Sequence, residues 1–428
     1  MLDLFRRKVP LSCLLYGLLE RCFSAERLDR IFLEHAKEQY TREILFSTVC
    51  DLLLSVVLKI HPSVNAAHQN HPEPLGFTVS ALYEKLKGVE LPVSSALLRE
   101  TSEDLSGILD ALGFEPEPWL PGYPIRILDG NCLAASEKRL AVHREVGGAA
   151  LPGKSLVVFD PERRLLDAVA RSLGAGELWI ADRNFCTLGF LDQIHEHGAY
   201  ALMRLHRSLP LAEETLFDHV EENAGRRILE KRVRVAGRQY RLVRVELEQP
   251  TRDGDTFIDL LTDLPRDIPA PVVADLYRKR WTLETAFQHL EKHFHSEIET
   301  LAYPKAALFG FALALVAYNI FSVVISSLDC AHEKPVSQEV SGYYIAHEIA
   351  ATFLALVQLG EGLDWGFAAA CAPSEFAAWL RETALHVNLR ALKKHSRGPK
   401  QPRTKPPYDP KQPHVSTYQL LKDKPGAL

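Results

Sequence analysis

The spacing of apolar residues changes at about residue 120, and this change constrains the fold more than any other feature of the sequence. Before it, segments such as LSCLLYGLLERCF repeat apolar residues at helical spacing, and Pro62, Pro72 and Pro74 interrupt them. After it come short runs rich in β-branched and aromatic residues, including IRILDGNC, KRLAVHREV, KSLVVFDP, ELWIADRNF and YALMRLH. The sequence therefore predicts a helical N-terminal domain followed by a mixed α/β layer.

Several further elements are predicted from local patterns. Residues 162–174, ERRLLDAVARSLG, predict a helix that ends at Gly174, and residues 187–198 predict another. ILEKRVRV and YRLVRVELE, separated by AGRQ, predict a hairpin, and FIDLLTDLP predicts a further strand. Residues 271–295 predict one long helix with Pro271 in its first turn, and helices are expected to continue to about residue 385. The proline-rich tail from 397 to 413 is expected to be extended or disordered.

The distribution of charge favours a nucleic-acid partner more than the total does. The net charge is −5, but residues 390–428 hold ten Lys or Arg and two Asp, so this tail carries +8 and the rest of the chain −13. A basic tail on an acidic body suits a DNA contact, and a solvated tail is an equal alternative. Seven cysteines without a CxxC pair indicate reduced thiols, and no secretory signal is expected, so a cytoplasmic location is predicted. The uncharged run at 307–327 is interpreted as a buried helix rather than a membrane span.

Three acidic residues form the candidate site. Asp129 follows the apolar run IRIL and Asp182 follows LWIA, so each stands at or near the end of a predicted strand. Taken singly, either fits a turn aspartate, since Asp-Gly-Asn is a good turn sequence. In the predicted helix, Tyr277, Arg280 and Glu284 fall on one face at about 100° per residue. Two carboxylates from strands and one from a helix packed on them would give oxygen ligands of the kind that Mg²⁺ or Mn²⁺ prefers.

These motifs in this order resemble DDE transposases of the insertion-sequence-four family. The resemblance covers about residues 120–325, with Asp129 in ILDGN, Asp182 in IADRNF, a strand-rich insertion, and then YRKRWTLETAF. The family's helix signature is Tyr, two residues, Arg, three residues, Glu, six residues, Lys. Tyr277, Arg280 and Glu284 match it, but Glu291 stands at the lysine position and Lys292 follows one residue later.

The resemblance implies a function and a set of partners. It implies a transposase that cuts at the terminal inverted repeats of an insertion sequence and transfers the 3′ ends to target DNA, with Mg²⁺ or Mn²⁺ held by Asp129, Asp182 and Glu284. It also implies double-stranded DNA as partner, a homodimer on that DNA, a prokaryotic nucleoid-associated location and no membrane. Tyr277, Arg280 and Lys292 are the expected DNA contacts of the helix, although an ion pair with Glu284 is the alternative role of Arg280. The basic hairpin, with Arg232, Arg234 and Arg241 as its candidate contacts, is expected to follow a phosphate backbone.

The predicted fold class is α/β, a mixed sheet flanked by helices, with a β-rich insertion and an all-helical N-terminal domain, and the resemblance implies that this sheet is ribonuclease-H-like. The expected domains are the helical N-terminal domain with possible DNA-end binding (1–115), the first part of the core (116–206), the β-rich insertion (207–265), the catalytic helix with the rest of the core (266–330), a helical C-terminal region (331–390) and the basic tail (391–428).

Other functions compete with this hypothesis. A ribonuclease-H-like nuclease without strand transfer would use the same carboxylates, and a transposase descendant could bind DNA without cutting it. Residues 148–155 match a P-loop pattern, but a strand rather than a helix is predicted after them, which favours a turn. His289, His293 and His295 lack the further ligands of a zinc site.

Overall fold

The computed structural model describes residues 2–39, 43–71, 74–132, 154–168, 173–223, 226–250, 254–298, 301, 303–349 and 365–395. The strand predicted from KRLAVHREV, most of the P-loop-like segment and nearly all of the basic tail lie outside these residues. The chain divides into two compact units. One unit consists of residues 1–115, 131–155 and 289–428, and the other of residues 116–130 and 156–288. We call them the helical unit and the sheet unit.

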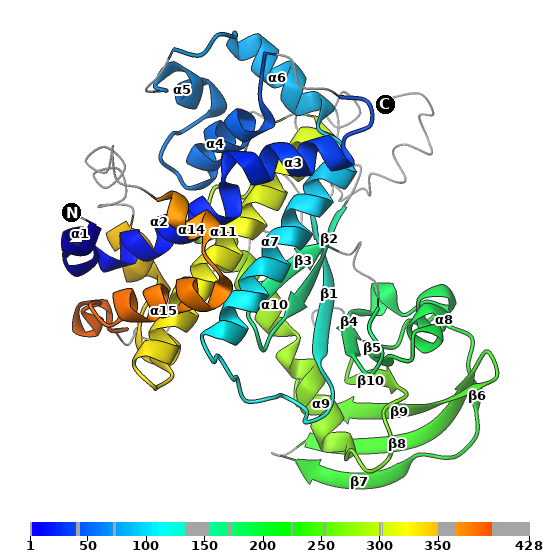
Figure 1. Ribbon diagram of the computed structural model, residues 1–428. Coiled ribbons are helices and arrows are strands. Elements are labelled where there is room, and N and C mark those ends of the chain that lie inside the picture. The colour runs from blue at the N-terminus through cyan, green and yellow to red at the C-terminus, as the bar shows by residue number, and fades with distance from the viewer. Residues whose placement is uncertain are drawn as a thin grey trace. The chain divides into compact units, whose positions relative to one another are not determined.

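The helical unit is built almost wholly from α-helices, so the predicted helical N-terminal segment is confirmed (Figure 1). Its two longest helices, α7 and α11, pack against each other, and α11 also contacts α4, α6 and α15. The helices are α1 (Leu2–Lys8), α2 (Pro10–Phe23), α3 (Ala25–His35), α4 (Phe46–Val57), α5 (Val64–Gln69), α6 (Val79–Gly88), α7 (Leu91–Ala111), α11 (Pro304–Ala331), α12 (Val336–Glu339), α14 (Gly366–Ala370) and α15 (Pro373–Ala384).

Helix α11 is long and apolar enough to cross a membrane by composition, yet it lies inside the protein. Its most apolar window is 89% buried, and the surrounding helices α2, α4, α6, α7 and α15 supply the contacts. A helix that is apolar on all sides is expected at the centre of a large helical core as well as in a bilayer. The structure therefore supports the interpretation of residues 307–327 as a buried core helix.

A buried ionic network joins early and late segments of the helical unit. The Arg21 guanidinium makes two 3.0 Å hydrogen bonds to the Asp104 carboxylate and also donates to the carbonyl oxygens of Ala368 and Cys371. Arg27 donates to the same carboxylate at 2.9 Å. The side chains of Arg21 and Asp104 are only 8% and 18% exposed, so each charge depends on the other for compensation.

We expect Asp104→Asn to lower the free energy of unfolding by about 3 kcal/mol, because it leaves the Arg21 charge buried without its counterion. Asp3→Asn, at the 81% exposed partner of Arg6, is the control and should change stability little. Urea denaturation of the two variants and the wild type measures both effects. Equal midpoints for Asp104→Asn and the wild type would contradict the prediction.

His293, near the end of α10 (Trp281–His293), has an unusual environment for a histidine. Its ring stacks on Phe321 with 6.0 Å between centroids and lies 5.7 Å from the His289 ring. Burial, with the nearby charges of His289, Lys292 and Lys59, lowers the pKa of His293 from 6.5 to about 4. Between these pH values the unfolded chain therefore binds more protons at this residue than the folded chain does.

The contribution of His293 to stability should accordingly be complete above about pH 6.5 and be lost as the pH falls towards 4. We expect His293→Gln to reduce the loss of stability on acidification, as measured by urea denaturation at pH 7 and at about pH 4.5. His197→Gln removes an exposed histidine and should keep the wild-type pH dependence. A His293→Gln profile parallel to that of the wild type would be evidence against this assignment.

The sheet unit contains a mixed sheet with the strand order β3-β2-β1-β4-β5-β10-β9-β8-β6, and β7 pairs with β8. The β1–β4 and β4–β5 pairs are parallel, whereas the β2–β3, β5–β10, β9–β10 and β8–β9 pairs are antiparallel. The strands are β1 (Ile125–Cys132), β2 (Lys154–Asp160), β3 (Leu165–Ala168), β4 (Leu178–Ala181), β5 (Tyr200–Arg204), β6 (Ala212–Glu213), β7 (Asp218–Asn223), β8 (Arg226–Val235), β9 (Arg238–Glu246) and β10 (Phe257–Thr262). The predicted mixed α/β fold is confirmed.

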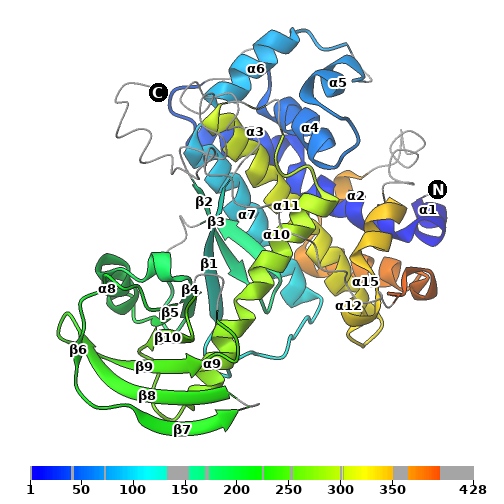
Figure 2. The same ribbon diagram turned by 180° about the vertical axis from the view of Figure 1, so that it is seen from behind.

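Helices cover both faces of the central strands. Helix α8 (Leu188–Glu196) packs Leu191 and Ile194 into an apolar cluster that includes Leu128, Ala181 and Met203 from β1, β4 and β5. Helix α9 (Ala270–Lys279) contacts β5, β8 and β9, and Figures 1 and 2 show α8 and α9 on opposite sides of β4 and β5. Side chains that alternate along β1 and β4 therefore point either to the α8 side or to the α9 side.

Two predicted helices are wrong in detail. Residues 162–174 were expected to form a helix, but Leu165–Ala168 form β3, antiparallel to β2, after a turn in which Arg164 has a φ of 61°. The apolar pair Leu165 and Leu166 suits a helix as well as a strand, and pairing with β2 decides between them. The single helix expected over 271–295 is divided at Arg280 into α9 and α10. There the amide of Arg280 bonds to the carbonyl of Tyr277, and that of Leu283 to the carbonyl of Arg280, a tighter 3₁₀ pattern.

The predicted hairpin and the helix after Asp182 are confirmed. β8 and β9 pair from Ile228–Val245 to Val235–Arg238, and Ala236 and Gly237 form the turn with positive φ values of 48° and 85°. Two central residues with positive φ are typical of the hairpin turn that matches the twist of the strands. α8 lies within residues 187–198, as expected, and the side chain of Thr187 caps its first turn.

Candidate active site

The register of the parallel strands brings the two aspartates together. β1 and β4 pair with Leu128 opposite Ala181, so Asp129 and Asp182 occupy the next step on each strand. The backbone of Asp182 is still extended, with φ −72° and ψ 167°, and neighbouring strands are separated by about 4.8 Å. Leu128 and Ala181 belong to the cluster on the α8 side. Their successors therefore point to the other face, on which α9 packs.

Arg280, at the junction of α9 and α10, connects the aspartate on β1 to the glutamate on the helix. Its guanidinium lies 2.8 Å from Asp129 Oδ2 and 3.3 Å from Glu284 Oε1. Arg280 is only 7% exposed, whereas the side chains of Asp129 and Glu284 are 22% and 32% exposed. Two of the three predicted carboxylates, Asp129 and Glu284, thus share the buried Arg280 guanidinium and still have access to solvent.

The pKa values show that Asp182 belongs to the same electrostatic cluster. The pKa of Glu284 is raised by burial, and the charges of Asp129 and Asp182 raise it further, while Arg280 lowers it. The pKa of Arg280 is raised above its usual value although burial lowers it, because Tyr277, Asp129, Asp182 and Glu284 all favour the charged form. Three carboxylates therefore act electrostatically on one guanidinium, and each anion raises the energy of the others.

Tyr277 lies one turn before Arg280 and faces the same cluster. The residue is 9% exposed, and its pKa is raised to about 12, chiefly by burial, with Asp182 raising it further and Arg280 lowering it. The phenol therefore stays protonated and keeps an O–H donor at neutral pH. Tyr277, Arg280 and Glu284 share one side of the helix, as their spacing predicts, even though the helix is divided at Arg280.

The donor set fits a divalent cation. Asp129, Asp182 and Glu284 offer only carboxylate oxygens, which are the ligands of Mg²⁺ and Mn²⁺. In the described part of the chain their oxygens are not grouped within 4.8 Å of one another, whereas the carboxylate oxygens of Glu34 and Glu100 and a ring nitrogen of His35 are. Arg280 stands between two of the three carboxylates and supplies positive charge there, and its Nε is buried without a hydrogen-bond partner in the described residues. A divalent cation would replace the charge of Arg280 and draw the oxygens of the three carboxylates closer to one another.

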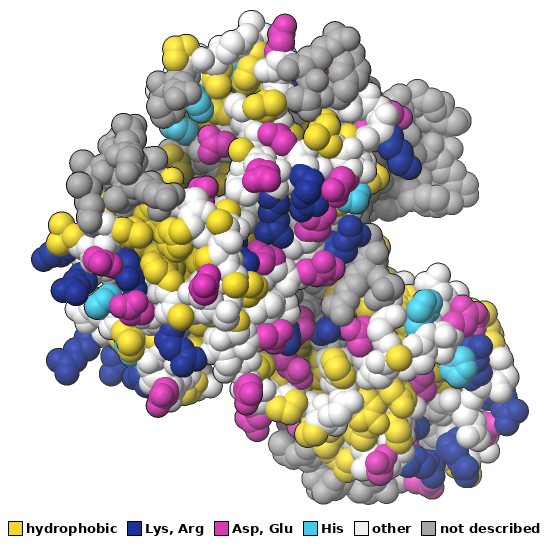
Figure 3. Space-filling view, viewed as in Figure 1, with side chains coloured by type: hydrophobic (Ala, Val, Ile, Leu, Met, Phe, Trp, Pro, Cys, Tyr) yellow, Lys and Arg dark blue, Asp and Glu magenta, His cyan; other side chains and the backbone are white. Residues whose placement is uncertain are grey.

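The residues predicted to contact DNA differ in their accessibility. On β8, Arg232 is exposed, and Arg234 is half exposed in an ion pair with Glu214. Lys and Arg side chains gather near β6 and the adjoining edge of β8 in Figure 3, where β6 pairs with Val233 and Arg234. Lys292 belongs to the helical unit, where its ammonium group lies 5.0 Å from the centre of the Tyr343 ring.

Arg241 has a structural role that the sequence did not indicate. It is 5% exposed, pairs with Glu230 through two hydrogen bonds, and donates to the carbonyl oxygens of Leu264, Pro265 and Ile268. A guanidinium with this many internal partners has little left to offer a phosphate. We therefore keep Arg232 and Arg234 as the candidate contacts of the hairpin and attribute to Arg241 the anchoring of the loop before α9.

Sequence reasoning missed a second group of basic residues close to the acidic ones. Arg183 follows Asp182 directly, and Arg204 ends β5, the strand next to β4. Both line a cavity together with Arg207. The available signal was the recurrence of arginine at the carboxyl ends of two predicted strands, in IADR and LMRLHR, but only strand pairing shows that these ends are adjacent.

The comparisons with known proteins match part of this chain. Residues 160–320 match the family model described as "Transposase DDE domain". The matched segment contains Asp182 and Glu284, and Asp129 lies before it. The chain is 28% identical over 159 residues to a putative transposase, y4zB, of Sinorhizobium fredii. It is also 33% identical over 150 residues to a bifunctional protein GlmU of Hyphomonas neptunium.

The two relatives are matched over limited segments. The alignments cover 33% and 31% of this chain, 44% of the putative transposase and 32% of the GlmU protein, so the chain spans less than half the length of either. The name of the second relative does not refer to transposition, and the family assignment rests on the family model and the first relative. They identify a transposase DDE domain in this chain, as its motifs predict. Assignment to the insertion-sequence-four branch stays a prediction.

The arrangement of Arg280 predicts how the site responds to a divalent cation. We expect Arg280→Gln to leave Asp129, Asp182 and Glu284 without their buried counterion, so that Mg²⁺ raises the thermal midpoint more in this variant than in the wild type. Arg278→Gln removes an equal charge at a 65% exposed position two residues before Arg280 and is the matched control. Thermal unfolding with Mg²⁺ and with EDTA measures the difference. Equal Mg²⁺-dependent shifts in both variants would show that Arg280 does not occupy the cation's place.

Proposed function

We propose that this chain is a DNA transposase that cuts at the terminal inverted repeats of an insertion sequence and transfers the 3′ ends to target DNA. Asp129, Asp182 and Glu284 would hold Mg²⁺ or Mn²⁺ and act as the catalytic carboxylates. The observation that carries this proposal is the placement of Asp129 and Asp182 at equivalent positions of adjacent parallel strands, with Arg280 joining Asp129 to Glu284. The DDE domain match supports it.

The proposed reaction has two balanced steps. In the first, a water oxygen forms a bond to phosphorus while the bond from phosphorus to the 3′ oxygen breaks, which leaves a 3′-hydroxyl and a 5′-phosphate. In the second, the 3′-hydroxyl attacks a phosphodiester of the target, and a new 3′-oxygen leaves. Bound divalent ions would lower the pKa of the attacking oxygen and stabilise the leaving one. No covalent bond to the protein is needed in either step.

The residues around the carboxylates would bind and orient the DNA strand. Once cations neutralise Asp129 and Glu284, the Arg280 guanidinium is available for a phosphate oxygen, to which it can donate two parallel hydrogen bonds. Tyr277, kept protonated by its raised pKa, can donate its O–H to the same phosphate. Their position on a helix that packs on the sheet fixes both donors relative to the aspartates.

The rest of the chain would supply further DNA contacts. We propose Arg232 and Arg234 on β8, and Lys292 on α10, as phosphate contacts, with residues 1–115 recognising the element ends and residues 391–428 adding positive charge. Two ends must be brought together for transposition, which favours a homodimer assembled on DNA. A cytoplasmic, nucleoid-associated location follows from these proposals. The contacts of Arg232 and Arg234 are supported by their exposure at the β6 edge.

Two alternatives share the same active site. A nuclease without strand transfer would perform only the first step, and an inactive descendant would bind DNA without either. The presence of all three carboxylates in one electrostatic cluster favours an active enzyme over the inactive descendant. The transposase relative favours strand transfer over simple hydrolysis.

The test is a cleavage and joining reaction with Mg²⁺ and DNA that carries the inverted repeats found beside the gene. We expect the wild type to produce nicked ends and joined products, and Asp182→Asn to reduce both by at least about a thousandfold while binding DNA normally. Asp275→Asn makes the same chemical change at a 49% exposed position on α9 and should retain activity.

Each other outcome selects a different function. Cleavage without joined products would identify a nuclease, and binding without cleavage by the wild type would identify an inactive descendant. Equal cleavage by Asp182→Asn and the wild type would remove Asp182 from the catalytic set.

A further inference from the structure

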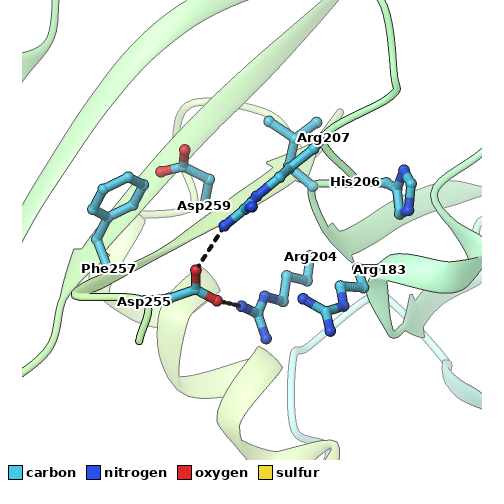
Figure 4. A pocket seen from close by; sticks show the side chains of 8 residues that line it. Arg183, Arg204, His206, Arg207, Asp255, Phe257 and Asp259 are labelled. Atoms are coloured by element: carbon cyan, nitrogen blue, oxygen red, sulfur yellow. Dashed lines mark hydrogen bonds and ion pairs between the residues drawn. The ribbon is translucent and has the colours of Figure 1, made fainter. Parts of the chain in front are cut away.

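A basic cavity lies at the carboxyl ends of β4 and β5. It has a volume of about 690 Å³ and is lined by Arg183, Arg204, Leu205, His206, Arg207, Asp255, Phe257 and Asp259 (Figure 4). Figure 4 shows the guanidinium groups of Arg183 and Arg204 next to each other, with Arg204 and Arg207 both directed to Asp255. All of these residues belong to the sheet unit.

The strand register places this cavity beside the candidate catalytic carboxylates. β4 and β5 pair with Ala181 opposite Met203, so Arg204 occupies the position next to Asp182. Asp129, Asp182 and Arg204 therefore form a row across three adjacent parallel strands. Burial raises the pKa of Tyr277, and the charge of Arg204 opposes this rise, in agreement with the position that the strand register gives Arg204.

The cavity holds more positive than negative charge. Arg204 and Arg207 bind the Asp255 carboxylate at 2.6 and 3.0 Å. The other carboxylate of the lining, Asp259, is engaged by Arg244 through two hydrogen bonds of 2.7 and 2.8 Å. One aspartate thus serves both Arg204 and Arg207, and Arg183 also lines the cavity. Like charges brought this close favour the binding of an anion.

An aromatic ring completes one wall. Phe257 is 40% exposed, and its ring centre lies 3.8 Å from the guanidinium carbon of Arg244, which also lies 4.6 Å from the Phe217 ring. This stacking, together with the two bonds from Arg244 to Asp259, fixes the ring in place. The cavity therefore combines several guanidinium groups with a fixed apolar surface, which suits a sugar-phosphate backbone better than a simple inorganic anion.

We propose that this cavity binds a backbone phosphate of the DNA strand next to the phosphodiester at the catalytic carboxylates. The proposal rests on the proposed function, because it places the cleaved strand over Asp129 and Asp182. Arg204 and Arg207 donate to the phosphate oxygens, and Arg183 supplies charge from the neighbouring strand end. Asp255 holds the two arginines in place when DNA is absent and is displaced when the phosphate enters.

The placement of Arg204 explains why such a contact matters at this point. A row of acidic side chains repels a polyanion, and the adjoining arginines offset that repulsion within one strand spacing of Asp182. When the cavity binds the neighbouring phosphate of the same strand, it thus holds the phosphodiester at the carboxylates in position. Arg204, Arg207 and Arg183 act as positioning residues in this arrangement.

The test measures the affinity of the full chain for a short fluorescein-labelled DNA duplex of arbitrary sequence over a range of salt concentrations. Each phosphate contact adds about 0.9 to the slope of log K against log salt concentration. We expect Arg204→Gln and Arg207→Gln each to lower the slope by about 0.9 and to weaken binding at low salt by roughly tenfold. Asp255→Asn should strengthen binding, because it removes the anion that competes with DNA.

Two features of the design keep the result decisive. Arg207 has a 91% exposed side chain, so Arg207→Gln reports on binding even where Arg204→Gln impairs folding. Arg278→Gln removes the same charge from α9 and should keep the wild-type slope. Wild-type slopes in both cavity variants, weaker binding by Asp255→Asn, or no binding by the wild type would overturn the proposal. Cleavage distinguishes the two proposals: a wild type that binds through this cavity and does not cut refutes the enzymatic function alone.

Discussion

The parallel pairing of β1, β4 and β5 is the constraint on which the rest of the site depends. Its register sets Asp129, Asp182 and Arg204 side by side, although more than fifty residues separate the first two in the chain. A shift of one residue on β4 would turn Asp182 towards the apolar cluster under α8 and bring Ala181 to the α9 face. The apolar residues before each charged one, Leu128, Ala181 and Met203, fix the register because they are buried in that cluster. Core packing thus determines where the charges stand.

Arg280 supplies positive charge between two of the carboxylates that are proposed to bind a divalent cation. Burial of a guanidinium and two carboxylates costs solvation energy that their attraction only partly returns, so the arrangement contributes little to stability. It specifies geometry instead: the helix is tied to β1 at one point, where α9 ends and α10 begins. Burial raises the pKa of both Glu284 and Tyr277, Asp182 raises each further, and the Arg280 guanidinium lowers each.

The sequence predicted the parts of the site that depend on local patterns. The two aspartates follow recognisable strands, and Tyr277, Arg280 and Glu284 share a helix face at any reasonable helix geometry, so their proximity could be anticipated. The helix expected at 162–174 failed because a short apolar pair is equally compatible with a strand, and only the partner strand β2 decides. The division of the helix at Arg280 occurs without a proline or glycine that could predict it, at the residue that forms the tertiary ion pair with Asp129. The domain roles stay predictions.

Charge in the sequence is a poor guide to charge at a surface, and the arginines of the sheet unit show why. Arg241 and Arg244 look alike in the hairpin sequence. Arg241 donates hydrogen bonds to the carbonyl oxygens of the loop before α9, whereas Arg244 is stacked between Phe217 and Phe257. Arg204 and Arg207 are three residues apart and Arg183 comes from an earlier segment, yet all three line one cavity. The two pairs of arginines differ in their carboxylate partners. Arg241 and Arg244 each have a carboxylate of their own, whereas Arg204 and Arg207 share that of Asp255. An arginine pair that shares a carboxylate retains attraction for a further anion, and here that attraction lies beside the carboxylates proposed to act on a phosphodiester.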